Sequence, residues 1–210
     1  MITLSGFRQI IEVLEDHPEP LNGQKLSAHI AWSESAAPPA NAEDFALEAI
    51  FVICNSGMQH RIARAIFERC RAAIEAGEPV STASRELFGL SPVFGHHGKA
   101  AAIDRIWNER ERLLAEYLAA ADKVAFCGSL PFIGEITKYH LAKNFGADCA
   151  KPDVHLVRLA SLEATDPHSL CARLSAESGL RVRTVDLVLW MACAKGVLNG
   201  HTGEITCQYA

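Results

Sequence analysis

The sequence lacks several features that would place it in familiar classes of protein. None of its apolar runs approaches the roughly 20 residues that a membrane-crossing helix needs. Residues 1–9 show no charged leader followed by a long apolar core. No segment keeps the alternation of a β-strand, and no Asn-Gly pair links two such segments. We therefore expect a cytoplasmic protein without a membrane partner and without β-sheets.

Cysteine pairs are also missing. The seven cysteines are scattered along the chain, their number is odd, and no two of them form a Cys-x-x-Cys pair. An iron–sulfur cluster needs closely spaced ligands, so we expect none, and we expect reduced and mostly buried thiols. The pair His96-His97 has no matching set of ligands, so no zinc site is expected.

Charge is unevenly distributed along the chain. The net charge is −5, which by itself counts against a nucleic-acid partner. Residues 1–50, however, hold 2 basic and 8 acidic side chains, so the remaining 160 residues are close to neutral. Residues 60–71 carry four arginines against a single acidic residue, Glu68. This local basic segment leaves room for salt-sensitive binding to phosphates.

Helical periodicity dominates the chain, and we predict an all-α protein of one globular domain or two interleaved lobes. Residues 33–41, with two prolines, are predicted to form a loop, and residues 99–121 the longest helix. The predicted helices span residues 7–14, 43–55, 60–75, 80–90, 99–121, 135–144, 153–162, 168–178 and 184–195.

The segment Leu130-Pro-Phe-Ile-Gly-Glu135 predicts a tight turn that opens a helix. Its apolar residues can anchor a hairpin between two helices, and Gly134 allows backbone N–H groups to point outward at the start of the second helix. Such amides bind a phosphate without reading sequence. A plain helical hairpin explains the same residues, because proline and glycine are ordinary turn residues.

Asp153 is the strongest catalytic candidate. It follows Pro152 at the predicted start of a helix, where the helix dipole and unpaired amides stabilise an ionised carboxylate. A fixed carboxylate beside a sugar can stabilise the positive charge that develops as a glycosidic bond breaks, or orient the attacking water. The simpler alternative is an aspartate that only caps its helix.

Together these segments resemble the helix-hairpin-helix (HhH-GPD) DNA glycosylase superfamily, in which a Leu-Pro-Gly-Val-Gly-like hairpin precedes a Val-Asp-x-His-like segment with the catalytic aspartate. Residues 51–60 are similar to the family's Ile-Leu-Ser-Gln element, and residues 94–102 to the start of its long central helix. The likeness covers roughly residues 45–195. It implies a two-lobed helical fold with the hairpin motif near residues 123–145, in a single domain whose residues 1–42 are a variable acidic segment and whose core is 43–195.

The resemblance also implies roles for individual residues. Asp153 would be catalytic, and DNA would be double-stranded with a damaged or modified base. Residues of the hairpin and of two helix starts would hold the DNA backbone, namely Pro131, Ile133, Gly134, Lys138, Lys99 and Arg61. Residues at the helix corner and two histidines would serve base flipping or the base pocket, namely Asn55, Met58, Gln59, His60, His140 and His155. A solvated corner and ordinary hydrogen-bonded histidines are the alternatives.

Two departures from the family pattern matter. Ile136 stands where glycosylases that also cut the strand carry a lysine, so no Schiff base with the sugar can form there. Lys138 is no substitute, because two residues along a helix turn the side chain by about 200°. Phe132 stands where the family usually has glycine, either narrowing the approach to the phosphate or packing against a neighbouring helix.

The leading hypothesis is therefore a monofunctional DNA N-glycosylase that leaves an abasic site. It needs no organic cofactor, and the hairpin leaves room for a monovalent cation. The wording of residues 139–160 also resembles the phage-associated branch of the superfamily, the alpha-glutamyl/putrescinyl thymine pyrophosphorylase-like proteins, which predicts either thymine hypermodification or attack on modified phage bases. A third hypothesis is a hairpin module that binds DNA without turnover. The sequence does not identify protein partners.

Overall fold

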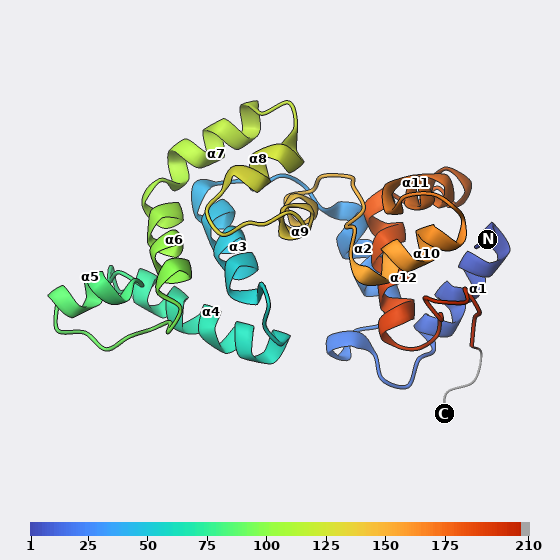
Figure 1. Ribbon diagram of the computed structural model, residues 1–210, viewed down its shortest axis with the longest axis horizontal. Helices are drawn as coiled ribbons and strands as arrows, with labels where there is room; N and C mark the ends of the chain where they lie inside the picture. The colour runs from blue at the N-terminus through green and yellow to red at the C-terminus, as the bar shows by residue number, and fades with distance from the viewer. Residues whose placement is uncertain (207–210) are drawn as a thin grey trace. The chain divides into compact units, whose positions relative to one another are not determined.

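The computed structural model describes residues 1–206, with the side chains of all of these except Asn22 and His60. In this part of the chain the regular structure is helical, apart from one isolated antiparallel bridge between Leu198 and Ile205, which confirms the all-α prediction (Figure 1). No described helix has the length and apolar character needed to cross a membrane. The helices are α1 (Leu4–Glu15), η1 (Leu21–Gly23), α2 (Leu26–Ser35), α3 (Ala42–Asn55), α4 (His60–Glu75), α5 (Thr82–Leu87), α6 (His97–Asn108), α7 (Arg110–Ala119), α8 (Lys123–Ser129), α9 (Thr137–Asn144), α10 (Val154–Leu162), α11 (Pro167–Ser178) and α12 (Val182–Ala194).

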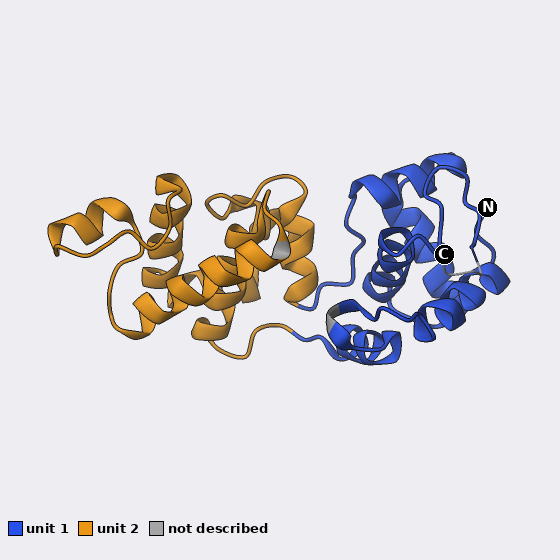
Figure 2. Ribbon diagram, turned by 90° about the horizontal axis from the view of Figure 1, so that it is seen from below, with its two compact units in different colours: residues 1–37, 146–210 blue, residues 38–145 orange. Residues whose placement is uncertain are grey.

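The chain forms two compact units (Figure 2). Unit 1 combines residues 1–37 with the chain from Gly146 onwards, and unit 2 is the continuous segment 38–145. The chain therefore leaves unit 1 after Ala37 and returns to it at Gly146. The hypothesis of a single glycosylase-like domain with a variable segment 1–42 stays a prediction.

Unit 1 is built around α12. Its residues Val185, Val188, Leu189 and Ala192 recur at helical spacing and are fully buried. They face a core to which α1 contributes Phe7 and to which α2, α10 and α11 also contribute side chains. Because α12 packs against all four of these helices, it fixes the positions of their ends, including the start of α10 that carries Asp153.

Unit 2 is built around α3, which contacts α4, α6, α7 and α9. An aromatic group closes its core: the rings of Phe45 and Phe145 stack with centroids 4.8 Å apart, and the ring of Tyr117 lies 5.0 Å from that of Phe145. The Tyr117 hydroxyl donates a hydrogen bond of 3.1 Å to the backbone carbonyl of Phe145. This bond satisfies a buried polar group and ties α7 to the end of α9.

The prediction of one long helix over residues 99–121 is wrong. The chain turns at Glu109, which ends α6 and precedes α7. Both helices pack on α3, which explains the bend, and the Glu109 carboxylate pairs with Arg105 on one side and Arg112 on the other. Neither proline nor glycine stands at this position, so the sequence carries no ordinary signal for the break.

The loop predicted over residues 33–41 starts too early, because α2 extends to Ser35. The apolar residues of α2 do not gather on one side, and its buried side chains are Leu26 and Ser33. By contrast, the predicted helix over residues 60–75 is confirmed by α4, which has the same ends. The prediction of buried, reduced thiols is confirmed for the six described cysteines: none is bridged, and only Cys193 is partly exposed.

Candidate functional site

The hairpin motif consists of α8, the loop 130–136 and α9, all within unit 2 (Figure 1). Leu130 and Ile133 are buried and anchor the loop. The Ile133 amide donates to the Leu130 carbonyl at 3.2 Å. The Gly134 amide donates to the Thr137 hydroxyl oxygen at 2.7 Å, so Thr137 fixes the start of α9 from inside its own first turn. Pro131, another expected backbone contact, is half-buried in the same loop.

Phe132 has an unusual backbone conformation, with φ at 60°. This left-handed region favours glycine, and another residue type there costs about 1–2 kcal/mol. Phe132 thus has a backbone geometry that is more usual for glycine. Its ring packs on the start of α6: it lies edge-on to the His96 ring at 5.5 Å, and a Cβ added to Gly98 would lie 2.5 Å from Phe132 Cζ. Of the two expectations for this side chain, the structure shows packing against a neighbouring helix.

A hollow of about 460 Å³ lies over the loop and is lined by Ser56 and residues 132–137. The amides of Glu135 and Ile136 make no hydrogen bond to any described residue, so both remain available to a ligand. The Glu135 carboxylate lies near them and forms an ion pair of 2.6 Å with Lys138. This partner raises the pKa of Lys138, whose charge is balanced by Glu135 in the structure.

The corner between α3 and α4 borders the same hollow through Ser56. Gly57 turns the chain with φ at 71°, and the exposed Gln59 directly precedes α4. Asn55 and Met58 are half-buried beside it, and Arg61 is exposed on the first turn of α4. The side chain of His60 lies outside the described part of the structure. The corner thus presents Gln59 and Arg61 outward, as a DNA contact would require.

Lys99 joins the corner to α6. Its ammonium donates a hydrogen bond of 2.6 Å to the carbonyl of Ser56, the residue that follows α3 as its C-cap, and its side chain is buried. Burial lowers the pKa of Lys99. A cation at the C-terminal end of a helix is electrostatically favourable. Lys99 therefore holds the corner against α6, and its expected contact with a phosphate stays a prediction.

Three segments singled out in the sequence thus meet within unit 2: the corner 55–59, the start of α6 at 96–99, and the loop 130–137. Phe132 links the loop to α6, Lys99 links α6 to the corner, and the hollow joins the corner to the loop. We call this combination the hairpin surface. Its residues come from three places in the sequence, yet their contacts are short and specific.

Asp153 belongs to unit 1 and caps α10. Its Oδ1 accepts hydrogen bonds from the amides of His155 at 3.0 Å and Leu156 at 3.1 Å. Oδ2 receives no hydrogen bond from the described residues, and the side chain is partly exposed. The carboxylate is therefore held in place by one oxygen and can act through the other. His155 is half-buried beside it, whereas His140 lies on α9 in unit 2, so the two histidines belong to different units.

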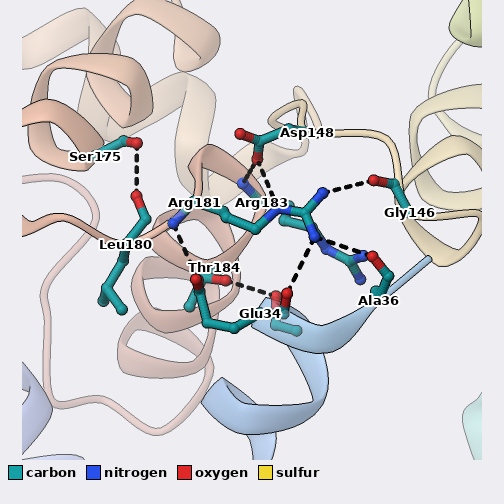
Figure 3. Close-up of polar contacts among 10 residues, drawn as sticks. Glu34, Ala36, Gly146, Asp148, Ser175, Leu180, Arg181, Arg183 and Thr184 are labelled. Atoms are coloured by element: carbon teal, nitrogen blue, oxygen red, sulfur yellow. Dashed lines mark hydrogen bonds and ion pairs between the residues drawn. The ribbon is translucent and has the colours of Figure 1, made fainter.

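The sequence did not predict an arginine cluster in unit 1, which Figure 3 shows. Arg181 donates hydrogen bonds to the carbonyls of Glu34 at 3.2 Å, Ala36 at 3.0 Å and Gly146 at 2.6 Å. It therefore holds together the two chain segments at which the chain leaves and re-enters unit 1. Arg183, two residues later, is fully buried. Arginine at the start of a helix is not a recognised capping pattern, so no sequence signal pointed to either residue.

In the described part of the chain, no three His, Cys, Asp or Glu side chains come close enough to hold a metal ion. The candidate groups are thus a hollow over the loop in unit 2 and, separately, a fixed carboxylate in unit 1. Comparison of the chain with protein-family models, with curated proteins and with solved structures gave no match.

Proposed function

We propose that this chain binds DNA through the hairpin surface and cleaves the N-glycosidic bond of a damaged or modified base with the help of Asp153. The observation that carries the proposal is that three segments singled out from the sequence meet: the corner and the loop share one hollow, and the α6 start contacts both of them. The all-helical fold agrees with this proposal.

The hairpin surface supplies the chemistry for a backbone phosphate. The amides of Glu135 and Ile136 lack acceptors and sit just before α9, where the helix dipole adds partial positive charge. Arg61 on the first turn of α4 adds a full charge. The Glu135 carboxylate opposes these groups, and its ion pair with Lys138 reduces that opposition. We therefore expect modest affinity that falls steeply with salt.

Asp153 supplies the chemistry of bond cleavage. As the bond between the sugar C1′ and the base breaks, its electron pair leaves with the base and positive charge develops on the sugar. The free Oδ2 can stabilise that charge and then accept the proton of the water whose oxygen bonds to C1′. The departed base takes up a proton from solvent and Asp153 returns its proton to solvent, which completes the hydrolysis. Ile136 offers no amine to the sugar, so the product is free base and an abasic site.

The test compares Asp153→Asn with Asp166→Asn on a panel of modified DNA duplexes, with released bases identified by mass spectrometry. Asp166 is a matched control because it caps α11 in the same way, with Oδ1 accepting from the amides of His168 at 2.9 Å and Ser169 at 3.0 Å. Asparagine caps a helix about as well as aspartate, so each variant should lose less than about 1 kcal/mol of stability. Only Asp153→Asn should lose base release. Its rate should fall by about 100-fold or more, which is the usual contribution of a general acid or base.

Three outcomes would contradict the proposal. If the wild-type protein releases no base from any duplex, cleavage is absent. If both variants lose activity equally, Asp153 acts only as a cap. If pyrophosphate is released while an elaborated base stays in the DNA, the chemistry is base modification and not excision.

A second candidate function is DNA binding without turnover. The observation that favours it is that all parts of the hairpin surface lie in unit 2 and none depends on Asp153. Duplex binding by wild type and by Asp153→Asn, equal in affinity and in salt dependence and without product in either, would support this candidate over the first.

A further inference from the structure

Among the residues that the structure describes, Arg183 is the most completely buried charged one, with 1% of its surface exposed. Its Nε and Nη1 atoms are buried and donate no hydrogen bond to any described residue. A guanidinium carries five N–H donors and stays charged under all ordinary conditions. Leaving such a group buried without acceptors opposes folding, so an arginine kept in this position calls for an explanation.

The other buried arginine, Arg85, shows how this chain ordinarily solves the problem. Its Nε donates to the carbonyl of Ser91 at 2.5 Å, and its Nη1 donates to Glu78 and to the carbonyl of Pro79, each at 3.0 Å. Arg181 likewise donates to three carbonyls. Arg183 therefore stands apart from both arginines, because its acceptors are missing.

The nearby carboxylates do not supply these acceptors, as Figure 3 shows. Asp148 Oδ1 accepts from the backbone amide of Arg183 at 2.9 Å and lies 3.9 Å from Arg181 Nε. Glu34 Oε1 accepts from the backbone amide of Arg181 at 3.0 Å. The Asp148 side chain is 42% exposed, so water screens its charge, whereas no water screens Arg183. The Asp186 carboxylate is also buried, three residues after Arg183, and accepts from the Lys151 amide at 2.8 Å, while the Arg183 Nε and Nη1 atoms keep no hydrogen-bond acceptor.

The Trp32 ring lies against the Arg183 guanidinium. The guanidinium carbon lies 5.3 Å from the centre of the Trp32 ring. Trp32 itself is 54% exposed, so its ring can turn outward without leaving a hole in the core. The ring therefore contacts both the guanidinium and the solvent.

We propose that unit 1 binds a phosphate group on the guanidinium of Arg183, with Trp32 as the movable outer wall of the site. A guanidinium bonds two oxygens of a phosphate at once, which would satisfy the buried donors. The second guanidinium, that of Arg181, and the first turn of α12 add positive character that suits a doubly charged anion. The site is independent of the proposed DNA cleavage, since free phosphate already has the required chemistry.

The test uses the full chain, inorganic phosphate as the ligand, and chloride at equal ionic strength as the reference. With phosphate about 100-fold above its dissociation constant, mass action should raise the unfolding midpoint of the wild type by about 5–10 °C. Arg183→Met should be at least as stable as the wild type without phosphate and should lose the specific rise. Arg85→Met, the matched control, should be less stable and should keep the rise.

Fluorescence gives a second readout. Phosphate should change the emission of the wild type, and the change should vanish in Trp32→Phe while Trp107 and Trp190 remain. An equal rise of the midpoint in wild type and Arg183→Met would show a general salt effect and overturn the proposal. If Arg183→Met does not fold, Arg183→Lys replaces it, because lysine keeps the charge but lacks the planar guanidinium that bonds two oxygens at once. A phosphate affinity of Arg183→Lys within twofold of the wild type would overturn the proposal.

Duplex binding by the wild type and by Arg183→Met, measured side by side, identifies the source of the phosphate. Weaker duplex binding by the variant, together with competition by inorganic phosphate, would assign the site to the DNA backbone. Equal duplex binding together with a phosphate response in the wild type would assign it to a free phosphate or a phosphorylated small molecule.

Discussion

The carboxylate of Asp153 raises the pKa of the Cys193 thiol. Burial is the larger cause, the negative charge of Asp153 adds to it, and together they bring the Cys193 pKa to about 11. Cys193 lies near the end of α12 and Asp153 caps α10, so the thiol reports on the charge of the proposed catalytic group.

We predict that Asp153→Asn lowers the pKa of Cys193 without returning it to the ordinary value, because burial remains. Thiolate forms as pH rises through the pKa, so alkylation of Cys193 should reach half its maximal rate near pH 11 in the wild type and at lower pH in the variant. Peptide mapping of alkylated Cys193 after brief exposure at a series of pH values measures both. Asp166→Asn serves as the control and should leave the profile unchanged. Identical profiles in wild type and Asp153→Asn would show that the two groups do not interact.

Phe132 and Gly98 should be strongly coupled. A Cβ at Gly98 would meet the Phe132 ring at 2.5 Å, so Gly98→Ala should cost about 1 kcal/mol in the wild type, where the ring must move aside. In the Phe132→Gly background the clash is gone, and the same change should stabilise α6 by about 0.5–1 kcal/mol. Chemical unfolding of the four proteins gives the coupling energy. A value near zero would mean that the ring does not rest on Gly98.

Gly146 and Gly179 separate two effects of replacing glycine. Both have a positive φ, at 82° and 79°. Gly179→Ala meets no neighbour and should cost only the backbone term of about 1–2 kcal/mol. Gly146→Ala would place a Cβ 2.7 Å from the carbonyl carbon of Ala37, so it should cost at least about 1 kcal/mol more. Equal losses of stability in thermal unfolding would show that the chain segments at Ala37 and Gly146 move apart easily.

Ile136→Lys should convert the proposed glycosylase into an enzyme that attaches itself to the sugar. Ile136 lines the hollow and is partly exposed, so a lysine there needs no burial of its charge. Its amine would attack C1′ as the base leaves, and borohydride would reduce the resulting imine to a stable protein–DNA adduct visible by electrophoresis. Glu135→Lys adds a lysine at the adjacent position and should give no adduct. A folded Ile136→Lys protein without adduct, on a duplex from which the wild type releases base, would place the sugar elsewhere.

The sequence predicted the elements whose determinants are local. The apolar spacing of residues 60–75 specifies α4 to the residue, and the loop 130–136 follows from its proline, glycine and buried Leu130 and Ile133. The break at Glu109 was not predictable in this way, because it arises from packing against α3, which contributes residues far away in the sequence. The end of α2 was missed because its apolar residues do not share one side.

The residues of the candidate site also fall into those predictable from local sequence and those that depend on long-range contacts. That Asp153 begins a helix could be predicted from its neighbours. The burial of Lys99 against Ser56 could not, because 43 residues separate them and a lysine near a glycine-rich loop looks solvent-facing in sequence. The same holds for Arg181 and Arg183, whose surroundings come from residues 32–36 and 146–148. Long-range contacts decide which charged groups face ligands and which hold the fold together.

The path of the chain through its two units also orders the assembly of the protein. Unit 2 is complete once residue 145 has left the ribosome, whereas unit 1 needs both residues 1–37 and the helices after Gly146. Helices α1 and α2 must therefore wait, with Phe7 and Ile10 uncovered, until α12 is synthesised. The Arg181 guanidinium lies at the N-terminal end of α12. It can therefore donate to the carbonyls of Ala36 and Gly146, and so join the two segments of unit 1, only at that final stage.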